Sequence, residues 1–86
     1  MNLNKQNLIN KILYRARYRG TKEMDIFIFS FVNSIINELN LEELNDLNEI
    51  INLDDEEMIK ICNNESKSDE YNKKIISGLI EFKNKF

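Results

Sequence analysis

The chain contains no proline and only two glycines, Gly20 and Gly78, among its 86 residues. Proline and glycine are the residues that most disfavour a helix interior, and tight β-hairpins depend on glycine-containing turns. A chain that nearly lacks both, and in which Ile, Leu, Asn, Lys and Glu dominate, is expected to be all-α. At this length it can bury only about 60% of its unfolded surface, so we expect one small domain over residues 1–86.

Apolar residues recur at the 3.6-residue helical period in five segments, which short polar breaks separate. We therefore expect a compact five-helix bundle whose central helix is the second segment, because that segment has the widest apolar face. Capping residues mark three helix starts: Thr21, Asn40 and Asp54, the last two with a glutamate three residues ahead. The predicted helices span about residues 5–18, 22–39, 41–51, 55–62 and 75–86.

Positive charge is concentrated at the amino-terminal end. Residues 1–22 hold six of the 12 lysines and arginines and no acidic residue, whereas the rest of the chain holds all 15 acidic residues. The formal net charge is nevertheless −3. A locally basic segment on an acidic chain indicates a cationic docking surface rather than a uniformly basic nucleic-acid-binding protein.

The residues most often used in catalysis and metal binding are scarce. The chain has no histidine and one cysteine, Cys62, so it lacks the usual proton shuttle, nucleophile pairs and soft metal ligands. We interpret Cys62 as a small hydrophobic core residue, and the acids from Asp54 to Glu57 as a capped, solvated helix start. The chain is therefore expected to be neither an enzyme nor a metalloprotein.

The sequence also bears on the compartment. No apolar run approaches the roughly 20 residues that span a bilayer, and the amino-terminal residues lack the apolar core of a secretory signal. The lone cysteine cannot form an internal disulfide, which is typical of a reducing compartment. We expect a cytoplasmic protein that is not inserted in a membrane.

The first two predicted helices meet at a tight corner formed by Arg19 and Gly20, where glycine can close a helix end. At about 100° per residue, the first helix places two cations and two tyrosines on the side that the core does not use. These residues are Lys11, Tyr14, Arg15 and Tyr18. Because tyrosine and arginine are enriched among the residues that dominate interface energies, this side is predicted to contact another protein.

Three residues at the start of the second predicted helix break its apolar pattern. Glu23 and Ile26 point away from the apolar arc, and an exposed isoleucine beside the corner again suggests a contact surface. Asp25 falls inside the arc, where an unpaired carboxylate is costly, so we expect it to cap the helix or to pair with a nearby arginine.

The segment from Tyr14 to Asp25 reads Tyr-Arg-Ala-Arg-Tyr-Arg-Gly-Thr-Lys-Glu-Met-Asp. It resembles the signature of the succinate dehydrogenase flavinylation factors, called succinate dehydrogenase assembly factor 2 in mitochondria and SdhE in bacteria. That signature is Arg-Gly-x-x-Glu, a hydrophobic residue and Asp, preceded by an arginine-rich helix end. The chain length and helix order also resemble the family, whereas Tyr18 and Thr21 replace a basic residue and a methionine that are common there.

The resemblance implies a bundle that binds the flavoprotein subunit of succinate dehydrogenase, and often that of fumarate reductase. It further implies that the bundle promotes attachment of FAD to a histidine of that subunit. This chain would then bind no cofactor stably, because FAD is attached to the partner, and it would be a monomer when free. Matched residue by residue, the implied site comprises Arg15, Arg17, Arg19, Gly20, Glu23 and Asp25.

Alternative interpretations of the corner stay open on pattern alone. Arg15, Arg17 and Arg19, with tyrosines for stacking, would also suit a small helical nucleic-acid-binding protein, although the net acidity argues against it. An antitoxin-like or purely structural interaction protein could use the same corner for an unrelated target. In the simplest case the arginines only form a solvated helix face, and the nearby acids only complement a helix dipole.

Overall fold

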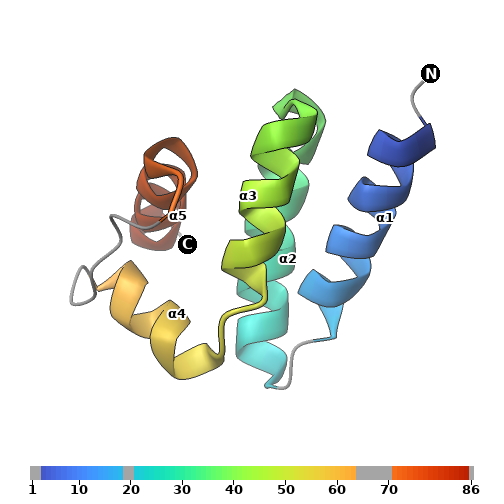
Figure 1. The fold of residues 1–86 in the computed structure, drawn as a ribbon. Coiled ribbons are helices and arrows are strands. Elements are labelled where there is room, and N and C mark those ends of the chain that lie inside the picture. The colour runs from blue at the N-terminus through green and yellow to red at the C-terminus, as the bar shows by residue number, and fades with distance from the viewer. Residues whose placement is uncertain (1–2, 19–20, 64–70, 86) are drawn as a thin grey trace.

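The computed structural model describes residues 3–18, 21–63 and 71–85, and within these ranges it contains helices and no strand (Figure 1). The prediction of an all-α bundle of five helices is confirmed. Its helices, together with one short 3₁₀ turn, are α1 (Leu3–Arg17), α2 (Lys22–Ile35), η1 (Ile36–Glu38), α3 (Leu41–Ile51), α4 (Asp55–Cys62) and α5 (Lys73–Lys85).

The predicted helix starts are confirmed by their caps. Thr21 Oγ1 accepts a hydrogen bond from the Met24 N–H at 3.3 Å, and Asp54 Oδ1 accepts one from the N–H three residues ahead at 2.8 Å. At α3 the cap is reciprocal: Asn40 Oδ1 accepts from the Glu43 N–H at 2.8 Å, and Glu43 Oε1 accepts from the Asn40 N–H at 3.0 Å. Each bond satisfies a backbone donor that the first helical turn leaves unpaired.

Three helix boundaries lie two or more residues from the predicted ones, and the first is the start of α1, at Leu3 rather than about residue 5. The second helix ends at Ile35 rather than Leu39, because the Ser34 hydroxyl donates to the Phe31 carbonyl at 2.6 Å and competes with the helical ladder at that acceptor. The chain then tightens into η1. The fifth helix begins at Lys73, two residues before the predicted start, since Asn72 Oδ1 accepts from the N–H of Lys74 at 2.9 Å and caps the first turn.

Helix α2 lies at the centre of the bundle, as predicted. It packs against α1 on one side and α5 on the other, while α3 lies along α1 and α4 lies across the foot of the molecule (Figure 1). The rings of Phe27 and Phe31 on α2 lie 5.9 and 5.7 Å from the ring of Phe82 on α5, measured between centroids. Such aromatic pairs stabilise the packing beyond the area that they bury.

In the part of the chain that the structure describes, every residue that is buried as a whole is apolar, and the half-buried Asn48 places its Oδ1 out of solvent without a hydrogen-bond partner. The largest fully buried side chains come from all five helices and include Ile12, Phe31, Leu47, Met58 and Leu79. Cys62 is also buried, as predicted. None of the described helices has the length and apolar character needed to cross a membrane.

Candidate protein-docking site

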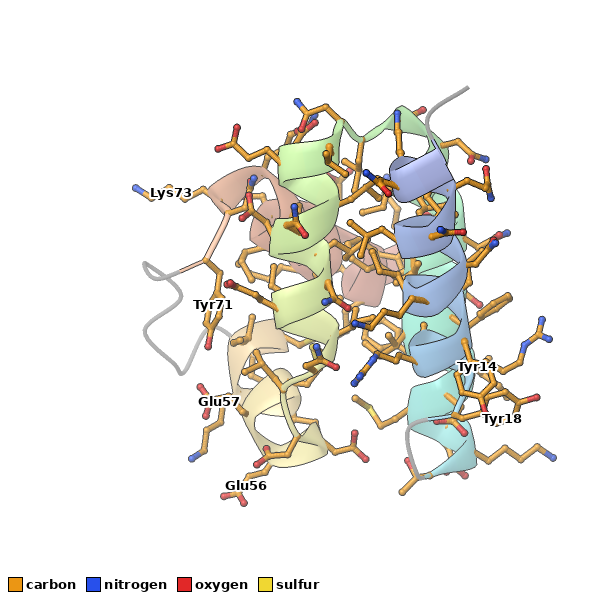
Figure 2. The ribbon with its side chains drawn as sticks, turned by 45° about the vertical axis from the view of Figure 1, so that its right-hand side comes forward. Tyr14, Tyr18, Glu56, Glu57, Tyr71 and Lys73 are labelled. Atoms are coloured by element: carbon orange, nitrogen blue, oxygen red, sulfur yellow. The ribbon has the colours of Figure 1, made fainter. Side chains whose placement is uncertain are left out.

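Two tyrosines project from the carboxyl-terminal end of α1 (Figure 2). Tyr14 is 68% exposed and Tyr18 64% exposed, and their ring centroids lie 4.9 Å apart. They lie on the same helix face because they are four residues apart, and their rings contact each other instead of the core. The predicted exposure of both tyrosines is confirmed, and together we call them the tyrosine ridge.

The tyrosine ridge borders a groove of about 730 Å³, which we call the α1 groove. Lys11 and Arg15, both exposed, complete the wall that α1 contributes. The structure therefore brings together on one groove the four α1 residues that the helical period had predicted to share a face. The opposite wall comes from the end of α3, the link to α4 and the start of α4: Ile51, Asn52, Leu53, Asp54 and Asp55.

A hydrogen bond joins the two walls of the α1 groove. Arg15 Nη1 donates to Asn52 Oδ1 at 2.7 Å, and Asn52 is the residue at which α3 ends. Both side chains are exposed, so this bond contributes little to the free energy of unfolding. It does hold the Arg15 guanidinium across the groove, where its remaining N–H groups can bind a partner's carboxylate or carbonyl.

The two walls carry opposite charge. Lys11 and Arg15 face the α1 groove from α1, and Asp54 and Asp55 face it from the start of α4. Sequence analysis had interpreted Asp54 only as a cap, and that role is confirmed. That these acids also face the cations of α1 across the groove depends on the packing of α1 against α3, so the local sequence does not predict it.

Arg17 lies on another side of α1. Its guanidinium carbon lies 4.6 Å from the centroid of the Phe29 ring on α2, a cation–π contact. It also lines a smaller hollow of about 260 Å³ behind the tyrosine ridge. Two residues of helix turn the side chain by about 200°, so Arg15 and Arg17 contact different elements. The single basic surface expected for them is replaced by two faces that the tyrosine ridge separates.

The three predicted residues of α2 lie in its first two turns. Ile26 is 50% exposed, as predicted. Glu23 is exposed, and its carboxylate has no hydrogen-bond or ion-pair partner among the residues that the structure describes. Asp25 is half-buried, and its N–H donates to the Thr21 carbonyl at 2.9 Å. The expected pairing of Asp25 with an arginine stays a prediction, and Arg19 and Gly20 lie outside the described residues.

Two further observations concern the lone thiol and the potential metal ligands of the described residues. Burial raises the pKa of the Cys62 thiol above its ordinary value, although nearby Lys83 opposes this, so little reactive thiolate is present at neutral pH. No group of three or more potential metal-ligating side chains occurs in residues 3–18, 21–63 and 71–85. What α1 offers is an exposed aromatic ridge beside a groove with two charged walls.

A comparison with known protein families identifies the chain. The sequence model of one family, described as a flavinator of succinate dehydrogenase, matches residues 10–83. The match spans every candidate site residue from Lys11 to Ile26 and most of the chain, and it confirms the resemblance drawn from the arginine-glycine signature. No curated protein and no solved structure matches the chain. The chain therefore belongs to the family of succinate dehydrogenase flavinators.

Proposed function

We propose that this flavinator binds the flavoprotein subunit of succinate dehydrogenase through α1 and the corner that follows it. In doing so it promotes covalent attachment of FAD to a histidine of that subunit. The observation that supports the surface is the tyrosine ridge beside the α1 groove: two large aromatic side chains lie exposed with Lys11 and Arg15 next to them. Tyrosine and arginine are the residue types that most often dominate interface energies.

The two charged walls of the α1 groove would set the orientation of the partner. A segment of the flavoprotein that enters this groove meets cations from α1 and carboxylates from Asp54 and Asp55. Only a segment with the reverse arrangement of charges avoids like-charge contacts, which gives specificity and register more than raw affinity. The tyrosine ridge would supply the apolar contact area, since each ring is largely exposed before binding.

The chain would act by positioning and would supply no catalytic group. Covalent flavinylation requires the flavin and the acceptor histidine to be held in reacting geometry, and positioning alone can lower a barrier by several kcal/mol. A rigid helical surface that binds one conformation of the flavoprotein favours that conformation by its differential affinity. FAD stays on the partner in this scheme, and the flavinator leaves without a cofactor of its own.

The signature residues complete the proposed site. Gly20 would let the backbones of the two proteins approach closely, while Arg19 and Glu23 would make charge-assisted hydrogen bonds across the interface, supported by Asp25. The free Glu23 carboxylate favours this role, because it has no partner among the described residues. We further propose that the flavoprotein of fumarate reductase is also a client, that the free chain is a cytoplasmic monomer, and that nucleic acid is not a ligand.

The test is the flavin fluorescence of the succinate dehydrogenase flavoprotein in a denaturing gel, which reports only covalent FAD. Deleting the gene should abolish or strongly reduce the signal, and the wild-type gene should restore it. Gly20→Arg and Glu23→Ala should fail to restore it although both proteins fold, whereas Glu49→Ala, at an exposed glutamate on α3, should restore it fully. Normal fluorescence with both signature variants would refute the proposed site.

A further inference from the structure

A second groove lies on the other side of α2, between α2, α4 and α5. It has a volume of about 350 Å³ and is lined by Met24, Phe27, Ile59 and Cys62, and the charged residues on it among those that the structure describes are Glu23 and Lys83. We call it the α4 groove. Its volume falls at the lower end of the roughly 300–1,000 Å³ typical of binding pockets. An apolar lining with a few charged groups is the usual composition of such a site.

Ile59 makes this groove unusual for a surface hollow. Helix α4 buries Met58, Ile61 and Cys62 in the core but leaves Ile59 47% exposed at the groove. A single exposed isoleucine is ordinary on a protein surface. Here it continues the apolar lining formed by Met24 and Phe27 of α2, so the groove presents an apolar floor edged by charge.

The two charged residues of the α4 groove differ in what they can still bind. Lys83 Nζ donates to Asn63 Oδ1, so its ammonium group already has a partner. The Glu23 carboxylate is exposed and unpaired among the described residues. An incoming segment would therefore find an unpaired carboxylate at Glu23, which a cation can pair with, while Lys83 keeps two N–H donors for an acceptor.

We propose that the α4 groove receives a large apolar side chain from the flavoprotein subunit, and that a lysine or arginine next to it pairs with Glu23. This inference rests on the proposed function, because its occupant is a segment of the same partner. Glu23 connects the two surfaces: it belongs to the arginine-glycine signature at the corner, and it also forms the edge of the α4 groove. The flavoprotein thus contacts both sides of the amino-terminal end of α2.

The test uses Ile59→Glu, which places a carboxylate in the apolar part of the α4 groove. The matched control is Leu41→Glu, because Leu41 is 42% exposed at the start of α3 and lies away from the groove. Binding of each purified full-length protein to the purified flavoprotein subunit is measured by titration calorimetry, and folding is checked by circular dichroism. Ile59→Glu should weaken binding by at least about tenfold, the loss typical of an important interface residue, and Leu41→Glu should leave it unchanged.

Two further measurements test the proposal without relying on Ile59→Glu. Glu23→Gln should weaken binding and reduce its dependence on salt concentration, because screening acts on the charge pair that this variant removes. Ile59→Cys places an exposed thiol in the groove, and its alkylation by N-ethylmaleimide, followed by intact mass, should slow when the flavoprotein is bound, while the buried Cys62 reacts slowly in both states.

The outcomes separate this inference from the proposed function. Suppose that the wild-type protein binds the flavoprotein, that Ile59→Glu binds as tightly, and that the thiol of Ile59→Cys is alkylated as fast in the complex as in the free protein. The α4 groove is then empty in the complex, and this inference is wrong while docking through α1 stands. If the wild-type protein does not bind the flavoprotein at all, both proposals fail. If Ile59→Glu weakens binding and the thiol of Ile59→Cys is protected in the complex, the groove is occupied.

Discussion

Exchanging Gly78 for alanine should stabilise the protein, and the structure sets the size of the effect. Gly78 lies in the interior of α5, where alanine is favoured over glycine by about 0.8–1.0 kcal/mol. A Cβ added there would lie 3.6 Å from Cε1 and 3.9 Å from Cζ of Phe31, which is ordinary van der Waals contact. The new methyl group therefore needs no rearrangement, and the helix-propensity gain should appear in full as about 1 kcal/mol of unfolding free energy.

For a domain of this size, 1 kcal/mol corresponds to a rise of about 4–8 °C in Tm. Urea unfolding followed by circular dichroism measures the free energy, and a thermal scan measures Tm. Ser77→Ala is the matched control, because Ser77 is the exposed neighbour in the same helix and should gain less than about 0.7 kcal/mol. A Gly78→Ala protein that is no more stable than the wild type would show that the Phe31 ring cannot accommodate the methyl group, and it would refute the packing at this position.

Three other predictions concern the caps and the α1 groove. Asn40→Ala should lower the unfolding free energy by about 1 kcal/mol in urea denaturation, since it removes one half of the capping box. The pKa of Glu43 is lowered, first by the hydrogen bond from the Asn40 N–H and then by Lys74. The free energy of unfolding that this provides should be fully present above the ordinary glutamate pKa and should fall as the pH drops below it. In denaturation measured at several pH values, Glu43→Gln should reduce this loss of stability at acid pH. Arg15→Ala should change the unfolding free energy by less than about 1 kcal/mol, yet it should weaken flavoprotein binding in calorimetry. Binding as tight as that of the wild type would contradict docking of the flavoprotein in the α1 groove.

The positions of most helices could be predicted from the sequence because capping residues and helix breakers act locally. Thr21, Asn40 and Asp54 each cap the helix that follows them, and the absence of proline leaves no competing break inside a helix. The end of α2 was predicted wrongly because Ser34 follows the helical period yet binds the carbonyl of Phe31. Periodicity describes which face a side chain occupies and says nothing of such a competing hydrogen bond.

Of the α1 groove, the sequence predicted only the wall that α1 supplies. Helical geometry places Lys11 and Arg15 with the two tyrosines, and the structure confirms this grouping. The facing wall around Asn52 depends on contacts between residues far apart in the sequence, so no local pattern indicates it. The α4 groove was missed for the same reason, because it forms where α2, α4 and α5 meet.

The apolar core has a consequence for how such chains diverge. Because the fully buried residues in the described part are all apolar, leucine, isoleucine and methionine can replace one another there at small cost if the total volume is kept. Two flavinators can then share a bundle while few of their interior residues coincide. Pairwise likeness fades under such drift, whereas the family model still matches residues 10–83 of this chain.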